Sequence, residues 1–299
     1  MFAINFCASL HSNFYPEGVQ PCDENELRLY GAAACAANSD SWLFREVFEE
    51  VYSGLGVPFY AALGNHDYYN NANVSAQVAY TQRSPSRQWR MPSRYYSWVE
   101  KLGEGKIATF ITLDTVILAG ATIQGYYGRM HPLTRMEVDA AEQQWSWLEY
   151  ELQRAQQQGA SFIVVQGHYP VHSACPHGPT TAAGFDKRLS ALLEKFSVSV
   201  YLAGHEHCIE VIEHAGVTHV ISGAASECCY PPVNLHTLPE GSLKFLHAAD
   251  GDVRQDKSTA FAVLTASLDP QGAYIVVTIV ARDGGVMFTS EPIHERQVL

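Results

Sequence analysis

Short apolar segments recur along the chain and alternate with segments whose apolar residues have a helical spacing. The apolar runs have the length of buried strands and lie at Val57 to Ala62, Ile107 to Leu113, Phe162 to Gln166, Val198 to Ala203 and Val217 to Ser222. Helices are predicted at 41–53 and 139–158, and the second carries a stripe of Trp145, Leu148 and Leu152 before Gly159. Alternating strands and helices predict an α/β fold in which helices cover a sheet.

The last part of the chain changes to the two-residue period of half-buried strands. Residues 260–266, 274–280 and 286–289 alternate apolar and polar positions, with Asp-Pro-Gln-Gly and Asp-Gly-Gly turns between them. We expect antiparallel strands here, within about 258–292, that complete a sandwich of two sheets. The segment 70–97 has no clear period and is predicted to be an ordered loop.

Composition and charge exclude several classes of protein. The chain has 299 residues, 47% of them apolar, which is enough for a full core. It has 31 acidic and 19 basic residues and no run of Lys or Arg, so we do not expect nucleic-acid binding on a broad basic surface. No apolar stretch approaches the roughly 20 residues that span a bilayer, and the apolar start lacks the basic region of a signal peptide.

The cysteines give little information about structure. There are seven, an odd number, and none forms a Cys-x-x-Cys pair. A structural zinc cluster is therefore not expected, and at least one thiol is unpaired within a monomer.

Three glycine turns that carry histidine each follow a predicted strand directly. They are Gly64-Asn65-His66-Asp67, Gly167-His168-Tyr169-Pro170 and Gly204-His205-Glu206-His207, and Asn13-Phe14-Tyr15 follows the first apolar run in the same way. Any one of them alone is an ordinary turn. Three in one chain favour a shared site at the carboxyl ends of the strands.

The residue types in these turns favour metal chemistry. Imidazole nitrogens and an amide oxygen suit zinc, iron or manganese. Two such ions roughly 3.5–4 Å apart bind phosphate between them and activate water, which makes phosphoester hydrolysis the predicted reaction.

At these turns the chain resembles the calcineurin-like metallophosphoesterases, and in particular purple acid phosphatases of the tartrate-resistant type. That family has D-x-G, G-D-x-x-Y, G-N-H-[DE], V-x-x-H and G-H-x-H in this order, and the last three are present here. The segments 73–77, 113–115, 144–148 and 177–180 are also similar. The resemblance implies a single domain over residues 1–299, a β-sandwich flanked by helices in α/β/β/α layers, with the motifs within about 12–225.

The resemblance also implies roles for individual residues in an acid phosphatase that hydrolyses phosphomonoesters. The family has a dinuclear centre, in which iron is paired with zinc, manganese or iron. Asn65, His168 and His205 would hold the divalent ion, and Tyr15 and His207 the ferric ion. The catalytic pair His66 and His177 would lie just outside these ligands, orienting the phosphate and protonating the leaving group.

The beginning of the chain departs from the family pattern. Counting back from Tyr15, Ser12 stands where the family has its bridging aspartate, His11 stands where it has glycine, and D-x-G has no counterpart. The two carboxylates of the ferric site are thus absent, so we expect one divalent ion at this centre. The pattern predicts that the first strand-helix unit is missing and the chain is N-terminally incomplete.

Three interpretations follow from this departure. The chain is an acid phosphatase whose start is wrong or comes from a variant transcript, or it is an inactive relative that binds one metal or a partner. A related phosphodiesterase is less favoured, because Tyr15 and the segment 73–77 point to the purple phosphatases. Asn73-Val74-Ser75 is a glycosylation sequon, and the resemblance implies a secreted or lysosomal glycoprotein.

Overall fold

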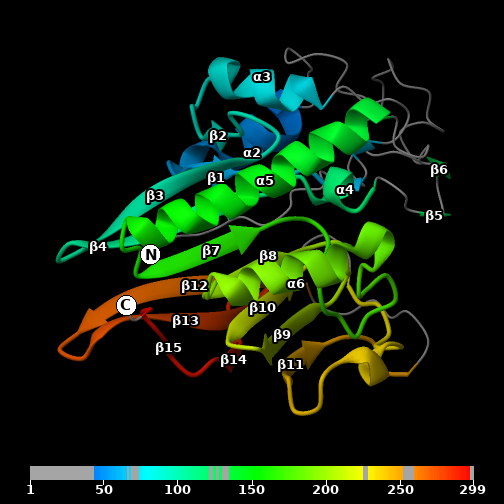
Figure 1. The fold of residues 1–299 in the computed structure, drawn as a ribbon, viewed down its shortest axis with the longest axis vertical. Helices are drawn as coiled ribbons and strands as arrows, with labels where there is room; N and C mark the ends of the chain where they lie inside the picture. Colours follow the sequence, from blue (N-terminus) through cyan, green and yellow to red (C-terminus); the bar gives the residue numbers. More distant parts are fainter. Residues whose placement is uncertain are drawn as a thin grey trace.

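A seven-stranded mixed sheet forms the centre of the computed structural model (Figure 1). The structure describes residues 44–65, 67–68, 74–120, 124–125, 128–129, 135–224, 228–251 and 259–296. The strand order of the sheet is β11-β9-β10-β8-β7-β4-β3. The small hairpin β5 (Gln124–Gly125) with β6 (Gly128–Arg129) lies apart from it.

Four neighbouring strands in the middle of this sheet run parallel. They are β4 (Lys106–Thr112), β7 (Phe162–Gln166), β8 (Val200–Ala203) and β10 (Val217–Ser222). Their carboxyl ends therefore meet at one edge of the sheet, where α/β proteins place their sites. All four coincide with predicted apolar runs.

Antiparallel strands close the sheet on both sides. β3 (Tyr96–Gly103) pairs with β4 at one side, and β9 (Ile209–His214) and β11 (Leu243–His247) continue the sheet beyond β10. The sequence analysis missed these strands.

Helices cover one face of the central sheet. α5 (Arg135–Gln157) corresponds to the predicted helix and buries Trp145, Leu148 and Leu152 as its stripe requires. Beside it lie α6 (Phe185–Lys195) and the short α4 (Thr115–Leu118). One apolar core joins these helices to inward residues of the strands, such as Ile163 and Tyr201.

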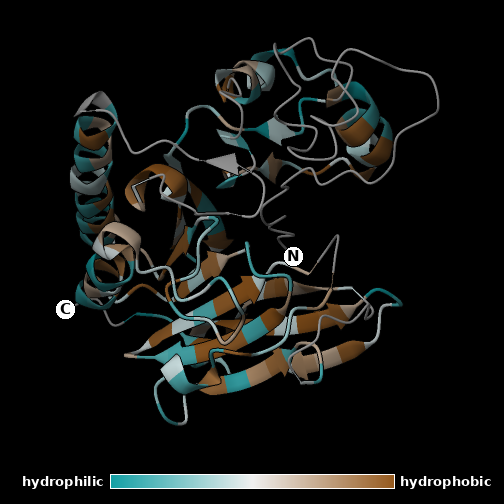
Figure 2. Cartoon of the chain, turned by 90° about the vertical axis from the view of Figure 1, so that its right-hand side faces the viewer, coloured by the Kyte–Doolittle hydropathy of each residue, from teal (hydrophilic) through white to brown (hydrophobic). Residues whose placement is uncertain are grey.

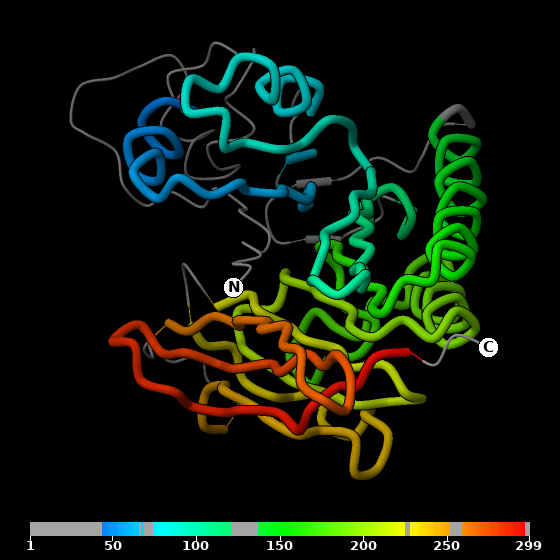
Figure 3. The backbone as a smooth tube through the Cα atoms, turned by 90° about the vertical axis from the view of Figure 1, so that its left-hand side faces the viewer, coloured from blue at the N-terminus to red at the C-terminus, as the bar shows by residue number. Residues whose placement is uncertain are grey.

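A second, four-stranded sheet covers the other face. β12 (Ala260–Asp269) pairs with β13 (Gly272–Ala281), which also pairs with β14 (Val286–Thr289) and β15 (Ile293–His294). Its buried residues pack against the opposite side chains of β7 and β8. Figure 2 shows hydrophobic residues concentrated on the strands of both sheets, and Figure 3 shows the C-terminal strands as a separate layer. The mixed α/β fold with flanking helices is confirmed.

Residues 44–98 contribute a further apolar cluster, in which several aromatic rings pack together. The helix predicted at 41–53 is the π-helix η1 (Phe44–Glu49), continued by α2 (Glu50–Tyr52) and the 3₁₀ turn η2 (Ser53–Leu55). Of the strand predicted at 57–62, only β1 (Phe59–Tyr60) pairs, with β2 (Trp89–Arg90).

The loop prediction for segment 70–97 was wrong where α3 (Ser75–Arg83) forms, and β2 and the start of β3 also lie within the segment. This helix buries Ala76, Gln77 and Tyr80, and the polar Gln77 among them interrupts an apolar period in the sequence. Gln77 donates to Asp67, and the Tyr80 hydroxyl donates to the buried Glu49. Tertiary partners, which a period analysis does not see, stabilise α3.

Two disulfides join cysteines in the described residues, Cys175 to Cys208 and Cys228 to Cys229. The remaining cysteines, Cys7, Cys22 and Cys35, lie outside the described residues. Within the described part of the chain, no helix is long and apolar enough to cross a bilayer.

Candidate metal centre

The turn that carries His168 is fixed by backbone hydrogen bonds at the end of β7. The Gly167 amide donates to the Leu202 carbonyl oxygen at 2.9 Å, and the Gly204 amide donates to the His168 carbonyl oxygen at 3.0 Å. The Thr115 hydroxyl oxygen accepts from the amides of both His168 and Tyr169, at 3.0 Å each. The ends of β7 and β8 and the start of α4 thus hold His168 in place.

The turn of residues 64–67 brings Asn65 to the His168 ring. The Asn65 Oδ1 atom lies 2.6 Å from His168 Nε2, and both side chains are buried. A Cβ atom on Gly64 would lie 3.0 Å from the His168 ring, so glycine allows this close approach. Asp67 closes the turn by accepting from the Gly64 amide at 2.7 Å. Burial raises the pKa of Asp67 to about 6.

His205 completes a group of three side chains. Its backbone is left-handed, with φ of 66°, and its Nδ1 atom lies 3.2 Å from His168 Nε2. His168 Nε2 therefore faces both an amide oxygen and a second imidazole nitrogen. An amide oxygen and two imidazole nitrogens thus converge at one point. These are ligand types that bind zinc-class cations, so these residues fit a divalent metal.

His177 and His207 lie on the flank of this group, around Tyr230. The His177 ring centre is 5.0 Å from that of His205 and 5.1 Å from that of Tyr230. The His207 ring stacks on Tyr230 at 4.6 Å, with an angle of 4° between the planes. The His177 side chain is 48% exposed, which places it at the rim of the site.

Glu206, between the two histidines of the last turn, is fully buried. Its Oε2 atom lies 3.7 Å from His177 Nδ1. Burial and the nearby Glu210 raise the pKa of Glu206 well above its ordinary value, which favours the neutral acid. Sequence reasoning did not assign Glu206, Thr115 or Tyr230 to the site. Asp114 and Thr115 were noticed only as part of the family resemblance.

Several predicted site residues lie outside the described residues. They are the ferric ligand Tyr15 and the catalytic His66, together with His11, Ser12 and Asn73 of the departures and the sequon. Among the predicted ligands that the structure describes, Asn65, His168 and His205 come together, and His207 lies beside them.

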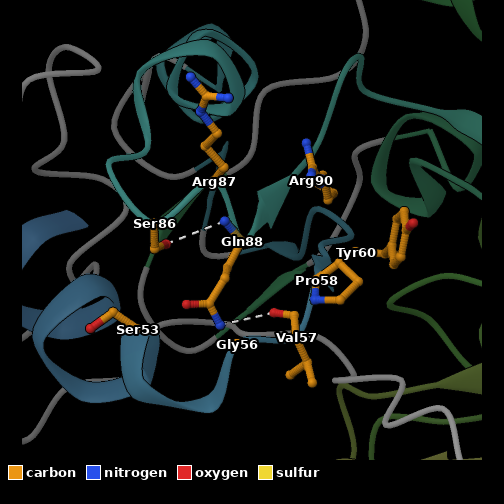
Figure 4. A pocket seen from close by; sticks show the side chains of 9 residues that line it. All are labelled: Ser53, Gly56, Val57, Pro58, Tyr60, Ser86, Arg87, Gln88 and Arg90. Atoms are coloured by element: carbon orange, nitrogen blue, oxygen red, sulfur yellow. Dashed lines mark hydrogen bonds between the residues drawn. The ribbon is translucent and has the colours of Figure 1, made fainter.

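A separate pocket of about 590 Å³ lies away from these ligands (Figure 4). Its lining residues are Ser53, Gly56, Val57, Pro58, Tyr60, Ser86, Arg87, Gln88 and Arg90. Within it, the Gln88 side chain donates to the Val57 carbonyl oxygen at 2.9 Å. None of the predicted metal ligands lines this pocket.

Comparisons with known proteins show a family match and several relatives. Residues 35–209 match the calcineurin-like phosphoesterase family. Tartrate-resistant acid phosphatase type 5 from Homo sapiens is 34% identical over 251 residues, 82% of this chain and 69% of that protein. The same enzyme from Oryctolagus cuniculus is 32% identical over 258 residues, 85% of this chain and 71% of that protein.

A Plasmodium protein is also similar. Glideosome-associated protein 50 of Plasmodium falciparum is 26% identical over 219 residues, 63% of this chain and 51% of that protein. The solved structure of GAP50, described as the anchor in the inner membrane complex of Plasmodium, superimposes with a TM-score of 0.66 at 24% identity, over 87% of this chain and 74% of that one. The chain belongs to the calcineurin-like phosphoesterase family, among the purple acid phosphatases of the tartrate-resistant type.

Proposed function

We propose that this chain is an acid phosphatase that hydrolyses phosphomonoesters at the centre formed by Asn65, His168 and His205. Members of its family catalyse metal-dependent hydrolysis of phosphoesters. The observation that carries the proposal is the convergence of His168 Nε2 with Asn65 Oδ1 at 2.6 Å and with His205 Nδ1 at 3.2 Å. Three neutral donor atoms at the carboxyl ends of parallel strands suit a divalent ion.

The identity of the metals forms part of the proposal. Two imidazoles and an amide oxygen would hold zinc, manganese or ferrous iron, whereas Tyr15 and His207 alone would hold ferric iron poorly. A bound metal would polarise the phosphate and lower the pKa of a bound water. Because Ser12 stands where the family has a bridging carboxylate, we expect one tightly held ion at this centre.

The protein side chains would orient the phosphate and move the proton. His177 lies at the rim next to His205, where it can contact a phosphate oxygen or the leaving-group oxygen. Glu206, whose Oε2 atom lies 3.7 Å from His177 Nδ1, would support the position of that ring. His66 adjoins Asn65 in sequence and is proposed to donate the proton to the leaving group.

The cellular setting follows from the relatives and the sequon. Tartrate-resistant acid phosphatases are secreted or lysosomal. This chain would therefore also be a secreted or lysosomal glycoprotein, modified at Asn73. Treatment with an N-glycosidase should shift the mass of protein from a eukaryotic host, and Asn73→Gln should abolish that shift.

A second candidate function is a non-catalytic binding protein with the same fold. Ser12 in place of the bridging aspartate favours it, as does the relative whose name describes association with an assembly rather than catalysis. Such a protein would bind phosphate or a protein partner near the centre without turnover. The test is whether metal-loaded protein binds phosphate and whether it releases product from a phosphomonoester. Binding without release would support the non-catalytic candidate.

Variants at the centre test the enzymatic proposal. His205→Ala should lower turnover of p-nitrophenyl phosphate at least about 100-fold and weaken zinc binding, because one of three ligands is lost. His66→Ala should lower turnover by roughly 10²–10⁴ with the metal retained. His294→Ala, at an exposed position far from the centre in sequence, is the matched control. Equal activity in His205→Ala and His294→Ala would contradict the assignment.

A further inference from the structure

A second group of histidines lies on the helix-covered face of the central sheet. His219 is in β10, His214 is the last residue of β9, and His172 follows the His168 turn. Asp186 lies at the start of α6, and its negative charge raises the pKa of His172, against the larger lowering by burial. None of these residues belongs to the family motifs.

The three rings pack edge to face. The His172 ring centre is 4.8 Å from that of His219 and 5.1 Å from that of His214, with interplanar angles of 79° and 82°. Tyr201 lies next to His219, with ring centres 5.9 Å apart, and its hydroxyl donates to the Tyr169 carbonyl oxygen. Tyr201 thus links this group to the turn that carries His168, while the group remains distinct from the centre described above.

Three buried polar atoms in this group make no hydrogen bond in the structure. They are His172 Nε2, His219 Nδ1 and Asp186 Oδ1. His219 is only 3% exposed, so its side chain is buried almost completely. Buried polar atoms without partners are rare and costly, and those of His172 and His219, whose rings are in contact, point to a ligand that they share.

The chemistry of these atoms favours a cation as that ligand. Burial, reinforced by the neighbouring imidazoles, lowers the pKa of His172 to about 4 and that of His219 well below its ordinary value. Both rings therefore keep a lone pair for coordination at neutral and mildly acidic pH, and Asp186 adds a negative charge. Two imidazoles on one tetrahedral ion, with metal–nitrogen bonds of about 2.0–2.1 Å, have ring centres about 5 Å apart. The spacings of His172 to His219 and of His172 to His214 have this value.

We propose that His172, His214, His219 and Asp186 form a second metal site, specific for a zinc-class divalent cation. Among the described residues, the groups whose ligand atoms already lie within 4.8 Å of one another are Cys175, Cys208 and Glu210, and Cys228, Cys229 and His247. The cysteines of both groups are in disulfides and offer no thiolate. In the histidine group the rings must turn about χ2, a soft torsion, to bring their nitrogens onto one ion.

The bound cation would have a structural role. It would join the β9–β10 hairpin and the start of α6 to the segment 170–178, which carries His177 at the rim of the phosphatase centre. This proposal does not depend on phosphatase activity, because metal binding at the histidine group is measured directly.

The test uses the full chain with His205→Ala as background, so that zinc at the phosphatase centre is weakened. After chelation, equilibrium dialysis with zinc should give about one ion per chain, and cobalt(II) should give the visible absorption of tetrahedral coordination. Adding His214→Ala or Asp186→Asn to this background should weaken zinc binding at least about 10-fold. His236→Ala, at an exposed position, is the control and should bind like the background.

Three outcomes would overturn the proposal. The first is no zinc uptake in the His205→Ala background, which would mean that water alone fills the group. The others are zinc uptake that neither His214→Ala nor Asp186→Asn reduces, and an equal loss in His236→Ala. Far-ultraviolet circular dichroism checks folding, and Asp186→Asn, a nearly isosteric change at a half-buried position, keeps the test valid if His214→Ala does not fold.

Discussion

At the scale of single residues, glycine turns with histidine were informative because each part has a physical role. Glycine at position 64 leaves room for the His168 ring, and the chain places Asn65, His168 and His205 within reach of one another. Their role as ligands stays a prediction. Glu206 and Thr115 could not be predicted from pattern, because buried acids and hydroxyls show their partners only in three dimensions.

Asp114 should make stability depend on pH. It is buried at the start of α4, where it accepts from the Ile117 amide and the Tyr68 hydroxyl, and burial raises its pKa from the ordinary 3.8 to about 6. Between these two values the folded state binds more protons than the unfolded state, so the free energy of unfolding falls as pH rises. One carboxyl shifted this far contributes a fall of roughly 2–3 kcal/mol.

Urea unfolding of Asp114→Asn measures this contribution. The free energy of unfolding of the wild type should fall more steeply between about pH 4 and 6 than that of the variant. Asp269→Asn, at the exposed last residue of β12, should keep the wild-type slope. Parallel curves for wild type and Asp114→Asn would show that this carboxyl has no raised pKa.

At the scale of elements, the parallel strands of the central sheet were predictable and its antiparallel strands were not. β7 and β8 are continuous apolar runs, since both of their faces pack in cores. β9 has the sequence Ile-Glu-Val-Ile-Glu-His, in which Glu210 is nevertheless buried and accepts from the Ala174 amide at 2.8 Å. A buried charge in a strand hides the strand from a hydropathy analysis, as polar partners hid α3.

Gly223, directly after β10, fixes how closely this strand approaches the His205 turn. A Cβ atom at this position would overlap the Glu206 carbonyl oxygen. Gly223→Ala should therefore lower the free energy of unfolding by about 1–3 kcal/mol and weaken metal binding, because the turn must shift. Gly54→Ala meets open space and serves as the control in thermal unfolding. Similar melting temperatures for the two variants would mean that the turn can shift without loss of stability.

The disulfide between Cys175 and Cys208 connects the segment that carries His177 to the turn that carries His205. It closes a loop with a sequence separation of 33 residues. The double variant Cys175→Ala/Cys208→Ala should lose roughly 2–4 kcal/mol of stability in urea unfolding, because the unfolded chain gains entropy. The wild type in a thiol reductant should behave like the double variant. Full stability under both conditions would exclude a structural role for this bond.

At the scale of the whole molecule, the central sheet places the turns after β7 and β8 at one edge, and the turn of residues 64–67, which follows β1 of a separate two-stranded sheet, meets them there. The alternation of strands and helices predicted the central sheet, and the two-residue period predicted the second sheet. Pairing between distant strands, such as β11 with β9, depends on contacts across the fold that no local pattern contains. Because the chain belongs to a phosphoesterase family, this edge is the proposed site of phosphoester hydrolysis.

The central claim is metal-dependent hydrolysis of phosphomonoesters at Asn65, His168 and His205. The most direct test is the initial rate of p-nitrophenyl phosphate hydrolysis at acid pH before chelation, after chelation, and after zinc, manganese or iron is restored. We expect the rate to fall at least about 100-fold on chelation and to recover when metal is added, but not in His205→Ala. A rate that chelation leaves unchanged, or metal-loaded wild type with no turnover, would contradict the account.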